Sequence, residues 1–310
     1  MRPLARIGTV AVTLTYLHLV FGGIVRISGS GMGCGDHWPK CNGSWIPPFD
    51  SPLVMVEWTH RLLALLVILS IGALAAAAWR SRSEPGVAGR GGVLRPALIS
   101  FALVVAVALL GMVTVKLGNT TLATVAHWTL AMALLGVLAA AAVRAGAFGG
   151  ESARQEGGTP RSARSLGAGA AIAFVIVVLG GLVAKYPGGA VACPSFPLCG
   201  ATPPGVAAGA GHLQMTHRGL AFLLMFHVFA VTLALARRPE ATAVKRVART
   251  AAVLVILQIG FGVAMVMSSL APTLRALHQA TGVAVWLSLF LATYLARVAS
   301  RAAPSHGMTA

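Results

Sequence analysis

The sequence predicts an all-α polytopic membrane protein, with eight transmembrane helices in two four-helix bundles related by a pseudo-twofold axis. Three observations lead to this prediction. The chain is 57% hydrophobic and only 10% charged, whereas a soluble domain carries about 25% charged residues. Apolar runs of about 20 residues, the length that spans a bilayer as a helix, recur along the chain. Finally, motifs from the first half of the chain return in the second half in the same order.

Eight segments are rich in Ala, Leu and Val and are too long for strands. Because lipid offers the backbone no hydrogen-bond partners, each is expected to be a helix. The expected spans are residues 7–27, 55–79, 96–115, 122–143, 166–185, 212–236, 247–268 and 273–298. The first span resembles a signal peptide, but it is long for one. It is followed by a weak cleavage sequence and soon by a strong second span, so we expect it to be retained.

The basic residues that give the net charge of +17 lie in short clusters between the apolar runs. This placement indicates a membrane surface and not a nucleic acid as the partner. Of the 24 Lys and Arg residues, 17 fall at the termini and in the even-numbered loops, and seven fall on the other side. The positive-inside rule therefore places both termini in the cytoplasm, and loops 28–54 and 186–211 outside it.

Each of these two outer loops is rich in Gly and Pro and holds two cysteines. Six residues separate Cys34 from Cys41, and five separate Cys193 from Cys199. Thiols oxidise outside the cytoplasm, so the pairs predict two local disulfides, with four free thiols as the alternative. A zinc site is disfavoured because the spacing is not that of Cys-x-x-Cys knuckles. Covalent haem attachment is not indicated, because the chain has no Cys-x-x-Cys-His motif.

A Thr-His-Arg triplet opens an apolar span twice, at His60 and again at His217. A Gly-Gly pair precedes each cysteine loop, at 22–23 and 180–181, and a second histidine follows each triplet, at His127 and His278. The matching halves are expected at 1–143 and 166–310, joined by a polar cytoplasmic linker at 144–165. Four spans per half is an even number, so both halves share one orientation, as in parallel repeats.

The four repeat histidines, His60, His127, His217 and His278, all fall near the outer ends of their spans. Ionisable residues inside a membrane are costly and usually functional, and neutral imidazole is a natural ligand of haem iron. His60 and His127 are therefore expected to bind one haem, and His217 and His278 a second, from facing helices of each bundle. A single membrane histidine is more often a hydrogen-bonded core residue, but four at equivalent positions favour ligands.

The remaining histidines have no partner in the repeat. We expect His18 and His227, which lie within spans, to pack or to form hydrogen bonds. His37, His212 and His306 lie in loops or in the tail and are expected to be solvated.

Glu57 lies at the mouth of a span, three residues before His60 and therefore on the same helix face. A carboxylate beside a bound macrocycle can bind a proton, stabilise a developing positive charge or hold water. The alternative is a helix cap or a simple pair with Arg61 at i,i+4. The second half has Gln214 at this position. Two matched sites that differ by one charge indicate one site for chemistry and one for a structural or electron-carrying cofactor.

These combined motifs resemble the haem A synthase family, and the resemblance covers roughly residues 7–298. The carrying features are the cysteine pair in each outer loop, the histidines at the starts of spans 2, 4, 6 and 8, and Glu57-Trp-Thr-His60-Arg61 as the family's Glu-x-x-His-Arg. The resemblance implies oxidation of the C8 methyl of haem O to a formyl group, giving haem A for cytochrome oxidase. It places haem O near Glu57, His60 and His127, and haem b between His217 and His278.

The resemblance further implies a bacterial plasma membrane, with haem O synthase and cytochrome oxidase assembly factors as protein partners. The electron donor is not identified by the sequence. Two other functions compete. A dihaem b-type electron-transfer cytochrome usually needs haems at two depths, whereas all candidate ligands here lie near one face. A membrane thiol-disulfide oxidoreductase would use the outer cysteine pairs but would leave the four histidines unexplained.

Overall fold

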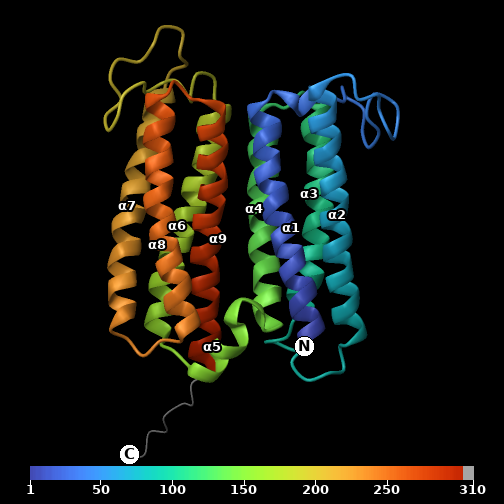
Figure 1. Cartoon of the computed structure of the whole chain (residues 1–310), viewed down its shortest axis with the longest axis vertical. Coiled ribbons are helices and arrows are strands. Elements are labelled where there is room, and N and C mark those ends of the chain that lie inside the picture. Colours follow the sequence, from blue (N-terminus) through green and yellow to red (C-terminus); the bar gives the residue numbers. More distant parts are fainter. Residues whose placement is uncertain (303–310) are drawn as a thin grey trace, which may run out of the picture.

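The structure is a computed structural model and describes residues 1–302. His306, which we expected to be solvated, lies outside the described residues. Within residues 1–302 the regular elements are helices (Figure 1). The α-helices are α1 (Arg2–Ile27), α2 (Pro52–Arg80), α3 (Leu94–Lys116), α4 (Thr121–Arg144), α5 (Gly150–Glu156), α6 (Pro160–Lys185), α7 (Ala210–Ala236), α8 (Thr242–Met267) and α9 (Pro272–Ala302). Short 3-10 helices occupy Ser30–Met32 and Ala147–Gly149.

Eight of these helices, all except α5, are long and apolar enough to cross a membrane. The chain is therefore a multi-pass membrane protein, which confirms the predicted fold class. The helices extend beyond the predicted spans, most clearly α6, which begins at Pro160, and α8, which begins at Thr242. Both of these predicted spans begin just after basic residues, but the helices extend through them. Long Lys and Arg side chains at a helix end can reach polar surroundings, so these residues can remain helical. Accordingly, the segment 144–165 is only partly a linker: it contains α5 and the first turns of α6.

The long helices form two groups of four, α1–α4 and α6–α9 (Figure 1). Within each group consecutive helices pack together, and the first also packs against the last. The groups meet where α1 and α4 contact α9 and where α4 contacts α6. The division into two functional halves and the pseudo-twofold axis between them stay predictions. We call the end that carries loops 28–51 and 186–209 the cysteine-loop end; α2, α4, α7 and α9 all begin there.

Helices α4 and α9 are the most enclosed. In their most apolar windows 56% of the residues are buried, against 17–33% in the other six long helices. Those six present much of their apolar surface outward, as expected of helices that face lipid. The two central helices pack closely: a Cβ on Gly136 of α4 would lie 2.8 Å from the indole of Trp286 on α9. Since α4 and α9 carry His127 and His278, these histidines lie on the best-buried helices.

Two equivalent hydrogen bonds join the halves near the cysteine-loop end, and both come from the residue that follows a repeat histidine. Trp128 Nε1 donates to the Val177 carbonyl over 3.4 Å, and Gln279 Nε2 donates to the Leu19 carbonyl over 3.3 Å. Arg26 donates to Gln279 Oε1 over 3.0 Å. The second histidine of each half is therefore held next to a contact with the opposite half.

At the other end, carboxylates hold the linker against the second half. Glu156 of α5 accepts hydrogen bonds from the backbone N–H and the hydroxyl of Thr242 at the start of α8. These hydrogen bonds lower the pKa of Glu156. Glu240 is buried and accepts from the backbone N–H of Thr159, just before α6. Both acids thus cap helix starts at which backbone N–H groups would otherwise lack acceptors.

Candidate functional site

A cavity of about 890 Å³ opens between the two groups of helices toward the cysteine-loop end. Its lining includes all four repeat histidines, together with Glu57, Gln214 and residues of both halves. Most of the other lining residues are aliphatic or glycine. The two predicted histidine pairs therefore contribute to one continuous apolar cavity.

Each repeat histidine packs against a glycine of the neighbouring helix in its own group. A Cβ added at that glycine would lie between 3.0 and 3.3 Å from the imidazole Cε1, closer than ordinary van der Waals contact. The pairs are Gly22 with His60, Gly111 with His127, Gly180 with His217, and Gly262 with His278. A larger residue at these positions would require each imidazole to shift by a few tenths of an ångström, so the glycines leave room for the four rings.

In the second half, the His217 and His278 rings face each other with centroids 6.5 Å apart and an interplanar angle of 64°. Metal–imidazole nitrogen bonds are about 2 Å long, so two imidazoles on opposite sides of one metal ion have ring centres roughly 6 Å apart. The observed separation would leave room for one metal ion between the two imidazoles.

The ring of His278 is oriented by Gln258. Its Nδ1 lies 3.2 Å from the Gln258 carbonyl, which can only accept, so Nδ1 carries the proton and Nε2 has the lone pair. Fixing the second nitrogen in this way is typical of metal-binding histidines. The Gln258 side chain donates from its own Nε2 to His278 Nε2 over 3.2 Å, and its Oε1 is buried without a partner among the described residues. Iron could reach His278 only after this amide turns away.

In the first half, the second histidine is oriented in the same way. His127 Nδ1 lies 3.1 Å from the carbonyl of Val107, which leaves His127 Nε2 available. His60 differs, because its ring stacks on His18 of α1, with centroids 4.2 Å apart and an interplanar angle of 15°. The Nδ1 atoms of His18, His60 and His217 are buried and have no hydrogen-bond partner within residues 1–302. Buried imidazoles in an apolar cavity, with nitrogens that the protein does not satisfy, fit the donor set of a haem site.

Glu57 and Gln214 make the same contact with their loops. Glu57 is 3% exposed, and its Oε2 accepts a 2.8 Å hydrogen bond from the backbone N–H of Cys34. Gln214 is 5% exposed, and its Oε1 accepts a 2.8 Å hydrogen bond from the backbone N–H of Cys193. The other carboxylate oxygen of Glu57 pairs with Arg61 at i,i+4. The structure thus shows the ion pair that we considered as an alternative, and it shows that either residue can hold a loop.

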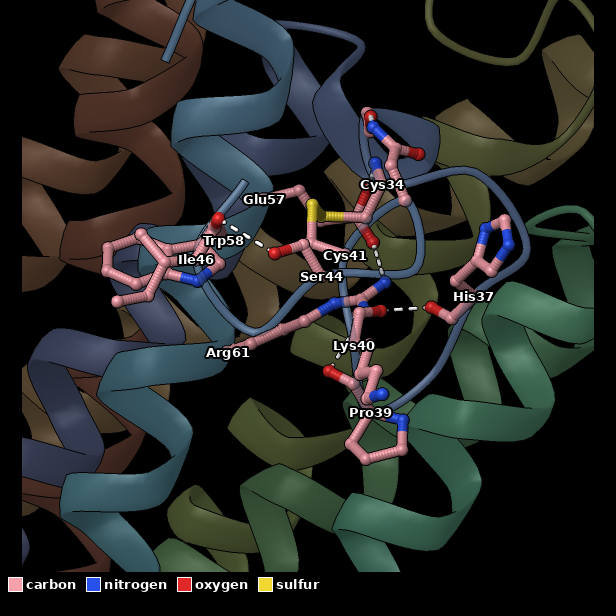
Figure 2. Close-up of a disulfide and its surroundings, with 12 residues drawn as sticks. Cys34, His37, Pro39, Lys40, Cys41, Ser44, Ile46, Glu57, Trp58 and Arg61 are labelled. Carbon is pink, nitrogen blue, oxygen red and sulfur yellow. Dashed lines mark hydrogen bonds and ion pairs between the residues drawn. A yellow bond between two sulfur atoms is a disulfide. The ribbon is translucent and has the colours of Figure 1, made fainter. Parts of the chain in front are cut away.

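The arginine of each Thr-His-Arg triplet also binds its loop, as Figure 2 shows for Arg61. Arg61 donates to the carbonyls of His37 and Lys40, each over 2.8 Å, and Arg218 donates to Ser195 and Cys193 over 2.6 and 2.9 Å. Both predicted disulfides, Cys34–Cys41 and Cys193–Cys199, form. Each loop is therefore closed by a disulfide and fixed onto the helix that carries the first histidine.

The sequence of residues 5–290 matches the model of a family described as cytochrome oxidase assembly protein, COX15-CtaA. The chain belongs to this family. Several relatives carry the name Heme A synthase. One from Geobacillus kaustophilus is 30% identical over 230 residues, which cover 72% of this chain and 69% of the relative. One from Bacillus licheniformis is 28% identical over 280 residues, 87% and 88% of the two chains. The resemblance seen in the sequence is thereby confirmed.

A shorter match has a different name. A Protoheme IX farnesyltransferase of Thermus thermophilus is 46% identical over 66 residues, which cover 21% of this chain and 10% of that protein.

All four repeat histidines and Glu57 line the cavity, and the roles assigned to them stay predictions. Four features of the site were missed in the sequence. His227 forms a hydrogen bond to the Ser165 carbonyl over 2.9 Å, as expected, and His37 and His212 are exposed. His18, which we expected to pack or to form hydrogen bonds, lines the cavity and stacks on His60. The missed features are His18 as a cavity residue, Gln258, the two loop-binding arginines and the glycines at the imidazoles. Gln258 could have been found in the sequence, because it is a single amide inside an apolar span. His18 has no histidine counterpart in the second half, so the repeat does not mark it.

Proposed function

We propose that this chain oxidises the C8 methyl group of haem O to a formyl group and so supplies haem A for cytochrome oxidase. The observation that carries the proposal is the pairing of two repeated histidine sites in one membrane cavity with a carboxylate beside only one of them. Membership of the family and the names of its relatives support the same reaction. The enzyme would thus be an oxidoreductase that acts on a membrane-embedded haem.

We assign the second half to a resident haem b bound by His217 and His278. The 6.5 Å ring separation and the fixed tautomer of His278 support this assignment. The haem supplies redox chemistry when bound. The protein supplies the two imidazoles, an apolar enclosure and the Gln258 side chain, which must turn to free His278 Nε2.

We assign the first half to haem O as substrate, with His60 and His127 as its ligands and Glu57 nearby. Conversion of a methyl into a formyl group is a four-electron oxidation, which balances with dioxygen as the oxidant: R–CH3 and O2 give R–CHO and H2O. An ionised carboxylate in a low-dielectric site stabilises positive charge on such a substrate better than an amide does. Glu57 is therefore the proposed catalytic residue, and its contacts to Cys34 and Arg61 hold its oxygens in place.

The basic residues at the cavity mouth fit the carboxylate groups of a haem. Arg61 and Arg218 each bind several loop carbonyls, so their first role is to hold the loops. Arg26 and Arg275 also line the cavity and place two positive charges near its cysteine-loop end. We propose that this end lies outside the cytoplasm and that both termini lie inside, as the positive-inside rule indicates.

The structure weakens both competing functions. The repeat histidines all lie near one end of the helices, whereas a cytochrome that carries electrons across the membrane needs redox centres at two depths. The cysteines are already paired, and Cys34, Cys41 and Cys193 are each no more than 1% exposed, which is unfavourable for thiol exchange. Among protein partners we propose a haem O synthase. The local match to a farnesyltransferase from Thermus supports this partner, and cytochrome oxidase assembly factors remain a further proposal.

The test is expression in cells that supply haem O, followed by pigment extraction, mass analysis and a reduced-minus-oxidised spectrum of the purified protein. The proposal expects bound haem b and conversion of haem O to haem A that depends on the protein. Haem b alone, with haem O unchanged, would favour the electron-transfer cytochrome. A protein without haem would support the thiol enzyme and contradict the proposal.

A further inference from the structure

The two halves of the cavity differ at a position on their first helices. His18 lies four residues before Gly22 on α1, and Ile176 lies four residues before Gly180 on α6. Both residues line the cavity. The first half thus has an imidazole where the second half has an aliphatic side chain.

His18 contacts the first repeat histidine through its ring face. The near-parallel rings of His18 and His60 are 4.2 Å apart, and the ring of Phe21 is parallel to His60 within 11° at 6.4 Å. Gly22 lies against His60 Cε1. The His60 imidazole therefore lies flat against one side of α1, next to the ring of His18 and the backbone of Gly22.

The stack restrains a ring that lacks the hydrogen bond found at the second histidine of each half. His127 and His278 each donate from Nδ1 to a backbone carbonyl, so their ring planes are fixed by a directional contact. His60 Nδ1 is buried and has no such acceptor in the described part of the chain. The His18 ring, with its centroid 4.2 Å away, is the closest aromatic contact that restrains the His60 plane.

We propose that His18 is a positioning residue for His60, which fixes the plane in which that imidazole is presented to the substrate haem. The proposal rests on the proposed function, since it takes His60 as a ligand of haem O. The flat ring of His18 carries this role, not its nitrogens, because face-to-face contact between rings is what restrains rotation. In the second half the equivalent position holds Ile176, and the nearest aromatic ring to His217 within the described residues is that of His278, at 6.5 Å and an interplanar angle of 64°.

The experiment compares His18→Ile, which introduces the residue found in the second half, with His18→Phe, which keeps a flat ring without nitrogens. Each variant is purified, loaded with haem O and examined by absorption and electron paramagnetic resonance, and haem A formation gives kcat and KM. His18→Ile is expected to weaken the histidine-ligated signal of the bound haem O and to lower kcat about threefold to tenfold, with KM changed less. His18→Phe is expected to keep most of both.

The haem b signal of the same preparations is the internal control for folding. A variant that loses haem b has lost its fold, and the comparison then uses His18→Leu against His18→Phe. A wild-type haem O signal and kcat in the aliphatic variant would overturn the proposal, as would an equal loss in the Phe variant. If the wild-type protein shows no haem O bound through His60, both this inference and the substrate assignment are overturned. A wild-type protein that binds haem O but forms no haem A overturns only the proposed reaction.

Discussion

Replacing Glu57 with Gln is expected to abolish most haem A formation while leaving the first cysteine loop folded. The structure of the second half supplies the reason. Gln214 accepts from the Cys193 N–H over 2.8 Å, the same distance at which Glu57 accepts from Cys34. Gln at position 57 can therefore keep the loop contact through its amide oxygen. The substitution removes the negative charge and the ion pair with Arg61.

The structure allows the size of both effects to be worked out. The Glu57 and Arg61 side chains are 4% and 15% exposed, and a hydrogen bond to a charged group contributes about 1.5–3 kcal/mol. Because Arg61 keeps its loop carbonyls, we expect Glu57→Gln to lower the free energy of unfolding by about 1–2 kcal/mol. Glu57→Ala additionally leaves the buried Cys34 N–H unpaired, which costs about 1–3 kcal/mol more. A tenfold or greater loss of turnover in the Gln variant corresponds to at least about 1.4 kcal/mol of lost transition-state stabilisation.

The assay is the ratio of haem A to haem O in pigment from cells that express each variant at matched protein levels. Thermal loss of the haem b spectrum reports stability in parallel. Gln214→Glu is the matched control, since it adds the same charge beside Arg218 and is expected to leave haem A formation in place. If Glu57→Gln gives a near-normal ratio, the charge has no catalytic role and Glu57 serves only to hold its loop.

Four further substitutions test the remaining assignments. His217→Ala and His278→Ala are each expected to lose or weaken haem b while the helices stay inserted. Full haem b spectra in both variants would refute the ligand assignment. The control is His227→Ala, which replaces a membrane histidine that is not assigned as a ligand. Gly262→Ala places a Cβ 3.2 Å from the His278 ring and is expected to weaken haem b, whereas Gly260→Ala, two residues earlier in open space, is expected to have little effect on the spectrum. Cys34→Ser is expected to lower the free energy of unfolding by about 2–3 kcal/mol, from the entropy of the loop that the disulfide closes, while Arg61 still holds the loop. Mass mapping of non-reduced wild-type peptides should find only the pairs Cys34–Cys41 and Cys193–Cys199. A crossed pair would contradict the two separate loops.

The fold could be predicted from the sequence because lipid restricts the backbone so strongly. An apolar run such as 166–185 has one stable form in a bilayer. Only its start was misplaced, because helix α6 already begins at Pro160, where basic residues continue the helix in polar surroundings. The disulfides were predictable because each pair is local. The short helix α5 was not, because its seven residues are polar and are held by contacts to α8 and α9 that are distant in sequence.

The candidate site was predictable to the extent that the repeat marked it. His60, His127, His217 and His278 were found by their equivalent positions, and all four line the cavity. His18 was missed because its importance comes from a ring contact between α1 and α2, which the repeat does not show. Arg61 and Arg218 were visible in the repeated triplet, but their contacts depend on the path of each loop, which no periodicity determines.

The shared loop contact of Glu57 and Gln214 bears on how two such halves can diverge after a gene duplication. At this position each loop requires only an oxygen atom that accepts one backbone N–H, and a carboxylate and an amide both provide it. A single substitution can then change the charge next to one proposed haem site while both loops keep their structure. Evolution, or a protein engineer, can in this way give the halves different chemistry without rebuilding the scaffold that they share.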